Sequence, residues 1–197
     1  MALLNRARTS ETDPLRIAVV PVGAGLVGLT ICPGKRGRSV FGASWERDLD
    51  ADVRVIREWG AAAVVTLIED HEFGMLGVER LPKAVRDAGM EWHHLPIRDV
   101  QVPDARFEGA WASAGVLLGD RLRNGGRLLV HCRGGLGRTG IVAARLLVEC
   151  AGATPQQALD AVREARPGAV ETPEQESWVL GLKAPSPIPD GAGHEMA

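Results

Sequence analysis

The sequence predicts a single α/β domain in which a central, mostly parallel sheet carries helices on both faces. The chain has 197 residues, about the length of one domain. Its content of 45% hydrophobic and 24% charged residues is ordinary for a globular protein with a core. Short apolar runs alternate along the chain with amphipathic stretches of helical period, which is the pattern of an α/β fold.

Five short apolar runs have the length and composition of strands. They are residues 16–22, 26–32, 62–68, 90–96 and 127–131. Six stretches with helical spacing of apolar residues separate or follow them: 44–59, 75–88, 105–123, 138–151, 155–166 and 173–182. Pro155 and the pair Thr172-Pro173 support the starts of the helices predicted over 155–166 and 173–182, because proline is favoured in the first helical turn.

The two ends of the chain differ from the rest in composition. Residues 1–14 are polar, and residues 184–197 are rich in proline and glycine, so we expect a flexible N-terminus, a domain over 15–183 and a flexible C-terminal tail. The first residues lack the apolar run of a signal peptide, and nowhere do 18 apolar residues follow one another. We therefore expect a cytoplasmic protein.

Charge and cysteine content narrow the classes of function. The formal net charge is −2, so nothing in the overall balance attracts nucleic acid or an anionic membrane, and we expect neither as a partner. The three cysteines, Cys32, Cys132 and Cys150, are odd in number and widely spaced. That spacing fits neither a disulfide framework nor a zinc ligand set, and it favours a reducing compartment.

The segment LLVHCRGGLGRTG places an apolar strand, a glycine-rich loop and a helix in direct succession. Gly134, Gly135 and Gly137 allow consecutive amide N–H groups to point at one anion, and the helix beginning near Arg138 directs its positive end to the same point. A cysteine in that field, Cys132, is favoured as the thiolate and hence as a nucleophile.

The residues around Cys132 are suited to the binding and transfer of a phosphoryl group. Arg138 carries a planar, permanently charged fork that can bind two phosphoryl oxygens. Thr139 can donate its hydroxyl to the sulfur and help it leave a phospho-enzyme. His131 is expected to hold the loop in shape through hydrogen bonds rather than to transfer protons.

The pattern H-C-x-x-G-x-G-R-[ST]-G at residues 131–140 resembles the signature of the cysteine-dependent protein tyrosine and dual-specificity phosphatases. The segments PIRDVQVPD (96–104) and ETPEQESWV (171–179) extend the likeness, which is greatest to the kinase-associated dual-specificity phosphatases. The resemblance covers residues 26–182 and implies the phosphatase fold. It also implies that no metal or organic cofactor takes part.

The resemblance also assigns roles to residues. The phosphate is held by the loop Arg133, Gly134, Gly135, Leu136, Gly137 and Arg138. In the family an aspartate about thirty residues before the cysteine is the general acid, which points to Asp99, with Asp104 as the alternative. Asp104 can equally be the N-cap of the helix expected from 105. Gln175 matches a family glutamine that positions the hydrolytic water.

The expected substrate is a phosphorylated protein carrying phosphotyrosine, with phosphoserine and phosphothreonine also accepted. The chain contains no tyrosine, so it lacks the aromatic wall of a deep pocket specific for phosphotyrosine. A phosphoinositide or another small phosphomonoester is the alternative substrate, although the loop lacks the lysines of lipid-directed relatives. A module that binds phosphoproteins without turnover would use the same loop, and Asp99 argues against it.

Three further features of the sequence each allow two interpretations. The segment Cys32–Arg38, read as a loop, carries Lys35, Arg36 and Arg38 and either attracts substrate or is a solvated turn. The acidic group 69–72 follows a strand and either selects substrate side chains or is simply exposed. Cys32 or Cys150 could form a reversible disulfide with Cys132 on oxidation.

Overall fold

A computed structural model describes residues 6–39 and 42–183, and its centre is a five-stranded sheet of order β1-β2-β7-β5-β6. β1 runs antiparallel to β2, and the other neighbours pair in parallel. The strands are β1 (Ala18–Val22), β2 (Gly25–Thr30), β5 (Ala63–Thr66), β6 (Glu91–His94) and β7 (Arg127–His131). The predicted mostly parallel sheet and all five of its strands are confirmed.

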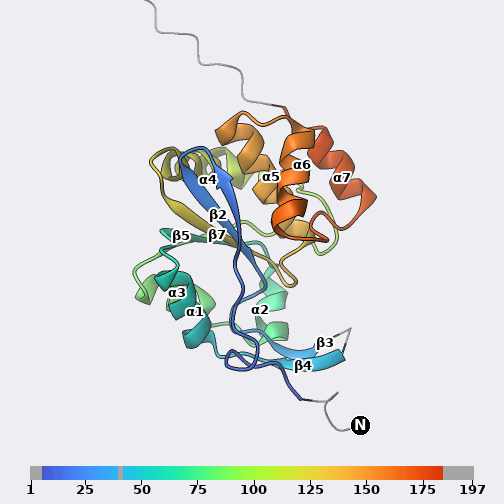
Figure 1. The fold of residues 1–197 in the computed structure, drawn as a ribbon. Helices are drawn as coiled ribbons and strands as arrows, with labels where there is room; N and C mark the ends of the chain where they lie inside the picture. Colours follow the sequence, from blue (N-terminus) through green and yellow to red (C-terminus); the bar gives the residue numbers. More distant parts are fainter. Residues whose placement is uncertain (1–5, 40–41, 184–197) are drawn as a thin grey trace, which may run out of the picture.

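Helices cover the sheet on both sides (Figure 1). The helices on one face are α4 (Ala105–Arg123), α5 (Gly137–Ala151), α6 (Pro155–Ala165) and α7 (Pro173–Leu180). Those packed into the apolar cluster of the other face are α1 (Leu49–Glu58), α2 (Asp70–Leu76) and α3 (Leu81–Asp87). None of these helices, within the described ranges, is long and apolar enough to cross a membrane.

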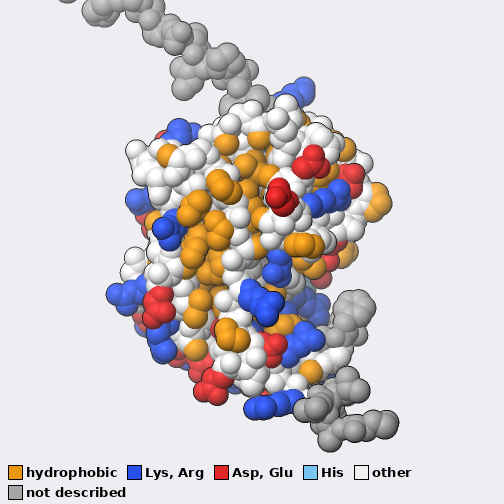
Figure 2. Space-filling view, in the orientation of Figure 1, with side chains coloured by type: hydrophobic (Ala, Val, Ile, Leu, Met, Phe, Trp, Pro, Cys, Tyr) orange, Lys and Arg blue, Asp and Glu red, His pale blue; other side chains and the backbone are white. Residues whose placement is uncertain are grey.

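The prediction of one helix over 44–59 is wrong in its first third. Residues Gly42–Glu46 form strand β4, which pairs antiparallel with β3 (Arg36–Ser39), so the second half of the basic segment is a strand and not a loop. Helix α1 begins only after Asp48, whose carboxylate accepts the N–H of Ala51 and caps the helix. Figure 2 shows Lys and Arg side chains gathered over the part of the surface where this hairpin lies.

The prediction of one helix over 75–88 is also wrong, because two short helices occupy this region. Gly77 ends α2 with a left-handed backbone (φ 65°), a conformation that glycine adopts without strain. The side chain of Glu69 accepts the N–H of Glu72, and Glu72 in turn accepts the N–H of Glu69, so a capping box starts α2.

Arg8, which lies in the N-terminal segment expected to be flexible, pairs with the hairpin instead. The N–H of Arg8 donates to the carbonyl of Ser44, and the N–H of Glu46 donates to the carbonyl of Arg8. The guanidinium of Arg8 lies over the ring of Trp45, 4.9 Å from its centroid. The ordered chain therefore begins before residue 15, while residues 1–5 and the expected C-terminal tail 184–197 lie outside the described residues.

The strand register brings three strand ends together. His131, the last residue of β7, lies opposite Thr30 at the end of β2 and opposite Thr66 at the end of β5. The loop that follows β7 therefore emerges in the middle of the carboxyl edge of the parallel strands. Ligands bind at this edge in open α/β sheets.

Candidate active site

The loop 132–136 joins β7 to α5 and surrounds the thiol of Cys132. That residue is 3% exposed, and its Sγ accepts a hydrogen bond from the N–H of Gly135 at 3.2 Å. Gly137 is the first residue of α5, a helix of 15 residues. The thiol thus lies at the positive end of a long helix, a position that favours the binding of an anion.

Gly135 is the loop position that no other residue can fill. Its φ is +68°, and a Cβ there would lie 2.4 Å from the carbonyl oxygen of Thr30. A side chain would therefore push the loop away from β2, and with it the amide that contacts Cys132.

His131 lies at the end of β7, directly before the loop. It is fully buried, and burial lowers its pKa to about 4, so the imidazole is neutral at pH 7. Its Nε2 is 2.8 Å from Oγ1 of Thr66, which also accepts the indole N–H of Trp92, and its Nδ1 is 3.4 Å from the carbonyl oxygen of Cys132. With its proton on Nδ1, the imidazole donates to the carbonyl of Cys132 and accepts at Nε2 from the hydroxyl of Thr66. Each of the three hydrogen bonds from Trp92 to Cys132 then has one donor and one acceptor.

Arg138 is 2% exposed and is held by a carboxylate that the sequence did not identify as its partner. Its Nη1 and Nη2 donate to the two carboxylate oxygens of Glu72 at 2.6 and 3.0 Å, and Nη1 also donates to the carbonyl of Ile97. Burial alone would lower the pKa of Arg138, but the bonds to Glu72 raise it above its ordinary value. Burial likewise would raise the pKa of Glu72, and the bonds from Arg138 and the Glu69 N–H lower it. Glu72 therefore positions the arginine, and the two alternatives left open for the acidic group do not describe it.

The structure separates the two candidate acids. Asp99 lies next to the loop, with Oδ1 2.8 Å from Nη2 of Arg138 and Oδ2 4.0 Å from Nη1 of Arg133. Asp104 is instead the N-cap of α4, and its Oδ1 accepts the N–H of Phe107 at 3.0 Å. Val100, the residue after Asp99, has φ 54°, a strained conformation for a β-branched residue of the kind found at functional sites.

Gln175 joins the loop of Asp99 to the start of α7. The side chain is fully buried; its Nε2 donates to the carbonyl of Gln101, and its Oε1 accepts the N–H of Glu171. Both polar atoms of this amide are thus bound to backbone, and its role in positioning the hydrolytic water stays a prediction.

Two basic residues brace the outside of the loop: Lys35, which is buried and so is not part of a solvated turn, and Arg166, which the sequence did not single out. Lys35 is 7% exposed and donates from Nζ to the carbonyl of Arg133 at 3.2 Å, and burial lowers its pKa to about 8. Its ammonium also lies 4.1 Å from the ring centroid of Trp45. Arg166 donates to the carbonyls of Gly135 and Gly134. Lys35 and Arg166 thus hold three carbonyls of the loop from its outer side.

Two buried polar atoms at the site have no hydrogen-bond partner within the part of the chain that the structure describes. They are Nε of Arg138 and Oγ1 of Thr139. Buried donors are nearly always paired, so unpaired ones beside a nucleophile indicate a site built for a ligand that accepts hydrogen bonds.

Fold and site together define a cysteine-dependent protein phosphatase of the dual-specificity class. The family model described as "Swiss Army Knife protein, DSP-PTPase phosphatase domain" (PTP-SAK) matches residues 40–179. The chain belongs to this family, and it is a cysteine-based dual-specificity phosphatase.

Known relatives agree with this assignment. Cyclin-dependent kinase inhibitor 3 of Mus musculus is 29% identical over 174 residues, which cover 86% of this chain and 79% of the mouse protein. The Rattus norvegicus protein of the same name is 30% identical over 138 residues, which cover 68% of this chain and 61% of the rat protein.

Two solved structures are similar in fold as well as in sequence. Kinase-associated phosphatase with its catalytic cysteine replaced by serine superposes with a TM-score of 0.74 at 27% identity, over 84% of this chain and 92% of that one. Tk-PTP in its active form superposes with a TM-score of 0.60 at 30% identity, over 78% of this chain and 88% of that one.

Proposed function

We propose that this phosphatase acts on phosphoproteins, removing phosphate from tyrosine and from serine or threonine, with Cys132 as nucleophile, Asp99 as general acid and Arg138 as phosphate ligand. One observation carries the proposal. The buried thiol of Cys132 lies at the positive end of α5, and the guanidinium of Arg138, from the first turn of that helix, contacts the carboxylate of Asp99.

In the first displacement the thiolate of Cys132 attacks phosphorus and the bond from phosphorus to the substrate oxygen breaks. Asp99, protonated at this stage, gives its proton to the departing oxygen, so the product leaves as an alcohol or phenol. The side chain of Asp99 is 49% exposed, which gives it access both to solvent and to a bound ester.

In the second displacement water attacks the cysteinyl phosphate. The carboxylate of Asp99 takes a proton from that water, the sulfur–phosphorus bond breaks, and inorganic phosphate forms. The hydroxyl of Thr139 supports this step, since it is buried, without a partner among the described residues, and able to donate to the departing sulfur.

Negative charge on the phosphoryl oxygens during both steps calls for fixed donors. The loop amides and Arg138 supply them, and the bidentate bond to Glu72 keeps the guanidinium in place before substrate arrives. Nε of Arg138 is the donor left for a phosphoryl oxygen.

The rim of the site favours substrates of different lengths. Asp99 and Arg133 flank the thiol with side chains 49% and 39% exposed, so the mouth is open rather than a deep shaft. An open mouth lets the short phosphoserine and phosphothreonine reach Cys132 as well as phosphotyrosine. The similarity to cyclin-dependent kinase inhibitor 3 and to kinase-associated phosphatase, both named for kinases, supports a protein substrate. A reactive thiol that must stay reduced favours the cytoplasm.

The test compares wild type with Cys132→Ser on phosphotyrosine, phosphoserine and phosphothreonine peptides and on phosphoinositides. We expect phosphate release from the peptides by the wild type and none by the variant. Turnover confined to phosphoinositides would contradict the protein substrate. Peptide binding without phosphate release between pH 5 and 8 would show a binding module instead.

A further inference from the structure

The carboxylate of Glu171 contacts the phosphate-binding loop directly. Its Oε2 accepts the N–H of Gly137, the first residue of α5, at 2.7 Å. Glu171 is an exposed residue of the connection between α6 and α7, so its side chain reaches the loop from the solvent side. No feature of the sequence alone assigns this contact.

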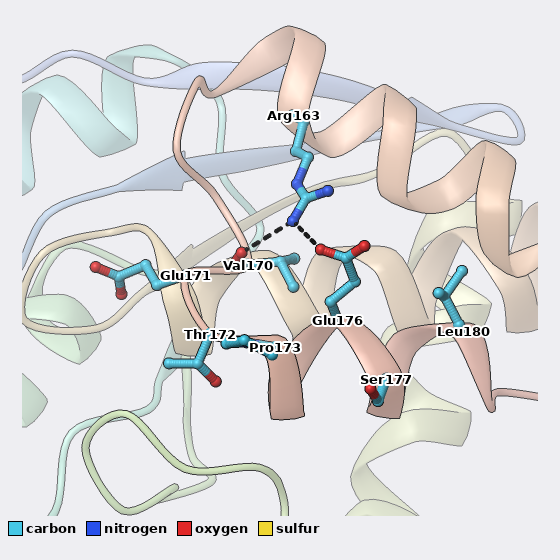
Figure 3. A pocket seen from close by; sticks show the side chains of 8 residues that line it. All are labelled: Arg163, Val170, Glu171, Thr172, Pro173, Glu176, Ser177 and Leu180. Atoms are coloured by element: carbon cyan, nitrogen blue, oxygen red, sulfur yellow. Dashed lines mark hydrogen bonds and ion pairs between the residues drawn. The ribbon is translucent and has the colours of Figure 1, made fainter.

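A strained backbone presents this carboxylate. Val170 has φ 59°, which is unfavourable for a β-branched residue and persists only where surrounding contacts enforce it. Arg163 supplies those contacts by donating to the carbonyls of Ala169 and Val170 and pairing with Glu176 at 2.6 Å. Figure 3 shows Arg163 bonded to Val170 and Glu176, while Glu171 points away from all three.

The loop itself makes room for the carboxylate. A Cβ at position 137 would lie 2.5 Å from Oε2 of Glu171, so only glycine allows the approach. The N–H of Glu171 donates to Oε1 of Gln175 at 2.9 Å, which fixes the backbone on the other side of the strained residue. The glycine at position 137 and the fixed backbone around Val170 thus both favour this contact.

The chemistry of the contact is that of an anion bound at a phosphate site. A carboxylate oxygen and a phosphoryl oxygen accept the same hydrogen bonds, and both are stabilised at the start of a helix. The amides of this loop are the donors that the proposed function assigns to the phosphoryl group. In the structure one of these amides already donates to a negative group of the protein.

We propose that Glu171 is an internal competitor for the phosphate site: it occupies the amide of Gly137 in the resting enzyme and yields it when a phosphoryl group binds. This inference deepens the proposed function and rests on it. The charge of Glu171 weakens the binding of substrate phosphate and of the product, inorganic phosphate, and so limits product inhibition.

The test uses Glu171→Gln, which removes the charge at nearly constant size, and Glu171→Ala, which also removes the acceptor. The matched control is Glu174→Gln, which removes an exposed carboxylate from the first turn of α7. Inorganic phosphate is the probe, and its binding is measured by the protection of Cys132 from alkylation by iodoacetamide. From Coulomb's law at a partly exposed site we expect about tenfold tighter phosphate binding in both Glu171 variants and a change below about twofold in the control.

A second measurement separates charge from structure. Removal of a negative charge speeds alkylation of Cys132 by iodoacetate, an anion, more than by iodoacetamide, which is neutral, whereas a distorted loop changes both rates alike. Phosphate binding that is unchanged or weaker in both Glu171 variants would overturn the inference, because a carboxylate that only braces the loop predicts weaker binding.

These assays need no turnover, so the two proposals fail separately. If wild type hydrolyses phosphopeptides through Cys132 while Glu171→Gln leaves phosphate protection unchanged, the inference fails and the function stands. If phosphate protection rises in the variants while no phosphopeptide is hydrolysed, the proposed function and the limit on product inhibition fail together, and only the competition between Glu171 and bound phosphate stands.

Discussion

The buried pair of Glu72 and Arg138 gives the sharpest test of how this site is held together. Loss of one partner of a buried pair costs about 3 to 5 kcal/mol when the other charge is left alone. Here the cost is smaller, because Arg138 keeps the carbonyl of Ile97 and the half-exposed Asp99. Glu72 also accepts the Glu69 N–H in the capping box, which adds about 1 kcal/mol.

For Glu72→Ala we therefore expect the free energy of unfolding to fall by about 3 kcal/mol, measured by urea unfolding. This corresponds to a fall in Tm of roughly 6 to 12 °C for a domain of this size. The kcat/KM for para-nitrophenyl phosphate should fall about 100-fold, because the guanidinium loses the two bonds that orient it. The control is Asp70→Asn on the same helix, whose exposed carboxylate should contribute less than about 1 kcal/mol.

The contribution of Glu72 to stability should decrease as the pH falls. Because the pKa of Glu72 is lowered in the folded protein, its stabilising effect is complete above pH about 4.5 and is lost as the pH falls further. The difference in stability between wild type and Glu72→Ala should therefore shrink in acid. A variant that matches wild type in both stability and kcat/KM at pH 7 would refute this account of the pair, and a loss of stability alone would refute the positioning of Arg138 by Glu72.

Three further predictions follow from the site. Asp99→Asn should lower kcat about 100-fold with stability unchanged, whereas Asp104→Ala should lower stability by about 1 kcal/mol with kcat unchanged; the reverse pattern would make Asp104 the acid. Because burial lowers the pKa of His131 from 6.5 to about 4 in the folded protein, the wild type should lose about 2 kcal/mol of stability between pH 7 and pH 5. His131→Asn, compared with wild type by urea unfolding at both pH values, should not show this loss. An equal loss of stability in the two proteins would mean that folding does not shift the pKa of His131. Thr139→Ala should slow breakdown of the cysteinyl phosphate more than its formation, seen in stopped flow as a larger burst of para-nitrophenol before slow turnover, and a proportional loss in both steps would contradict a role for the hydroxyl at the departing sulfur.

The sequence predicts what is local in this protein. The order of strand, glycine-rich loop and helix around Cys132 and Arg138 follows from residues that are neighbours in the chain, so both the loop and its place on the sheet edge are recovered. Glu72, Lys35 and Arg166 reach the loop from segments 66, 98 and 31 residues away, as counted between the bonded partners. Charged residues at such positions look like solvated surface until the tertiary fold brings them together.

The errors in the secondary structure have equally physical causes. The hairpin of β3 and β4 has the polar sequence RGRS and GASWE, without the apolar alternation that signals a strand. Its strands pair mainly with each other and with Arg8, outside the main sheet. The break at Gly77 falls within a run of helical period, where one left-handed residue ends a helix that the pattern alone would continue.

Helix α5 has two roles at once, since it begins at the catalytic loop and then runs through the apolar interior with 11 of its 15 residues buried. The helix whose dipole acts on the sulfur is therefore also a central part of the hydrophobic core. Heating or denaturant that unpacks α5 from the interior should therefore also displace Arg138 and the loop of Cys132, so the phosphate site and the core should be lost in one transition.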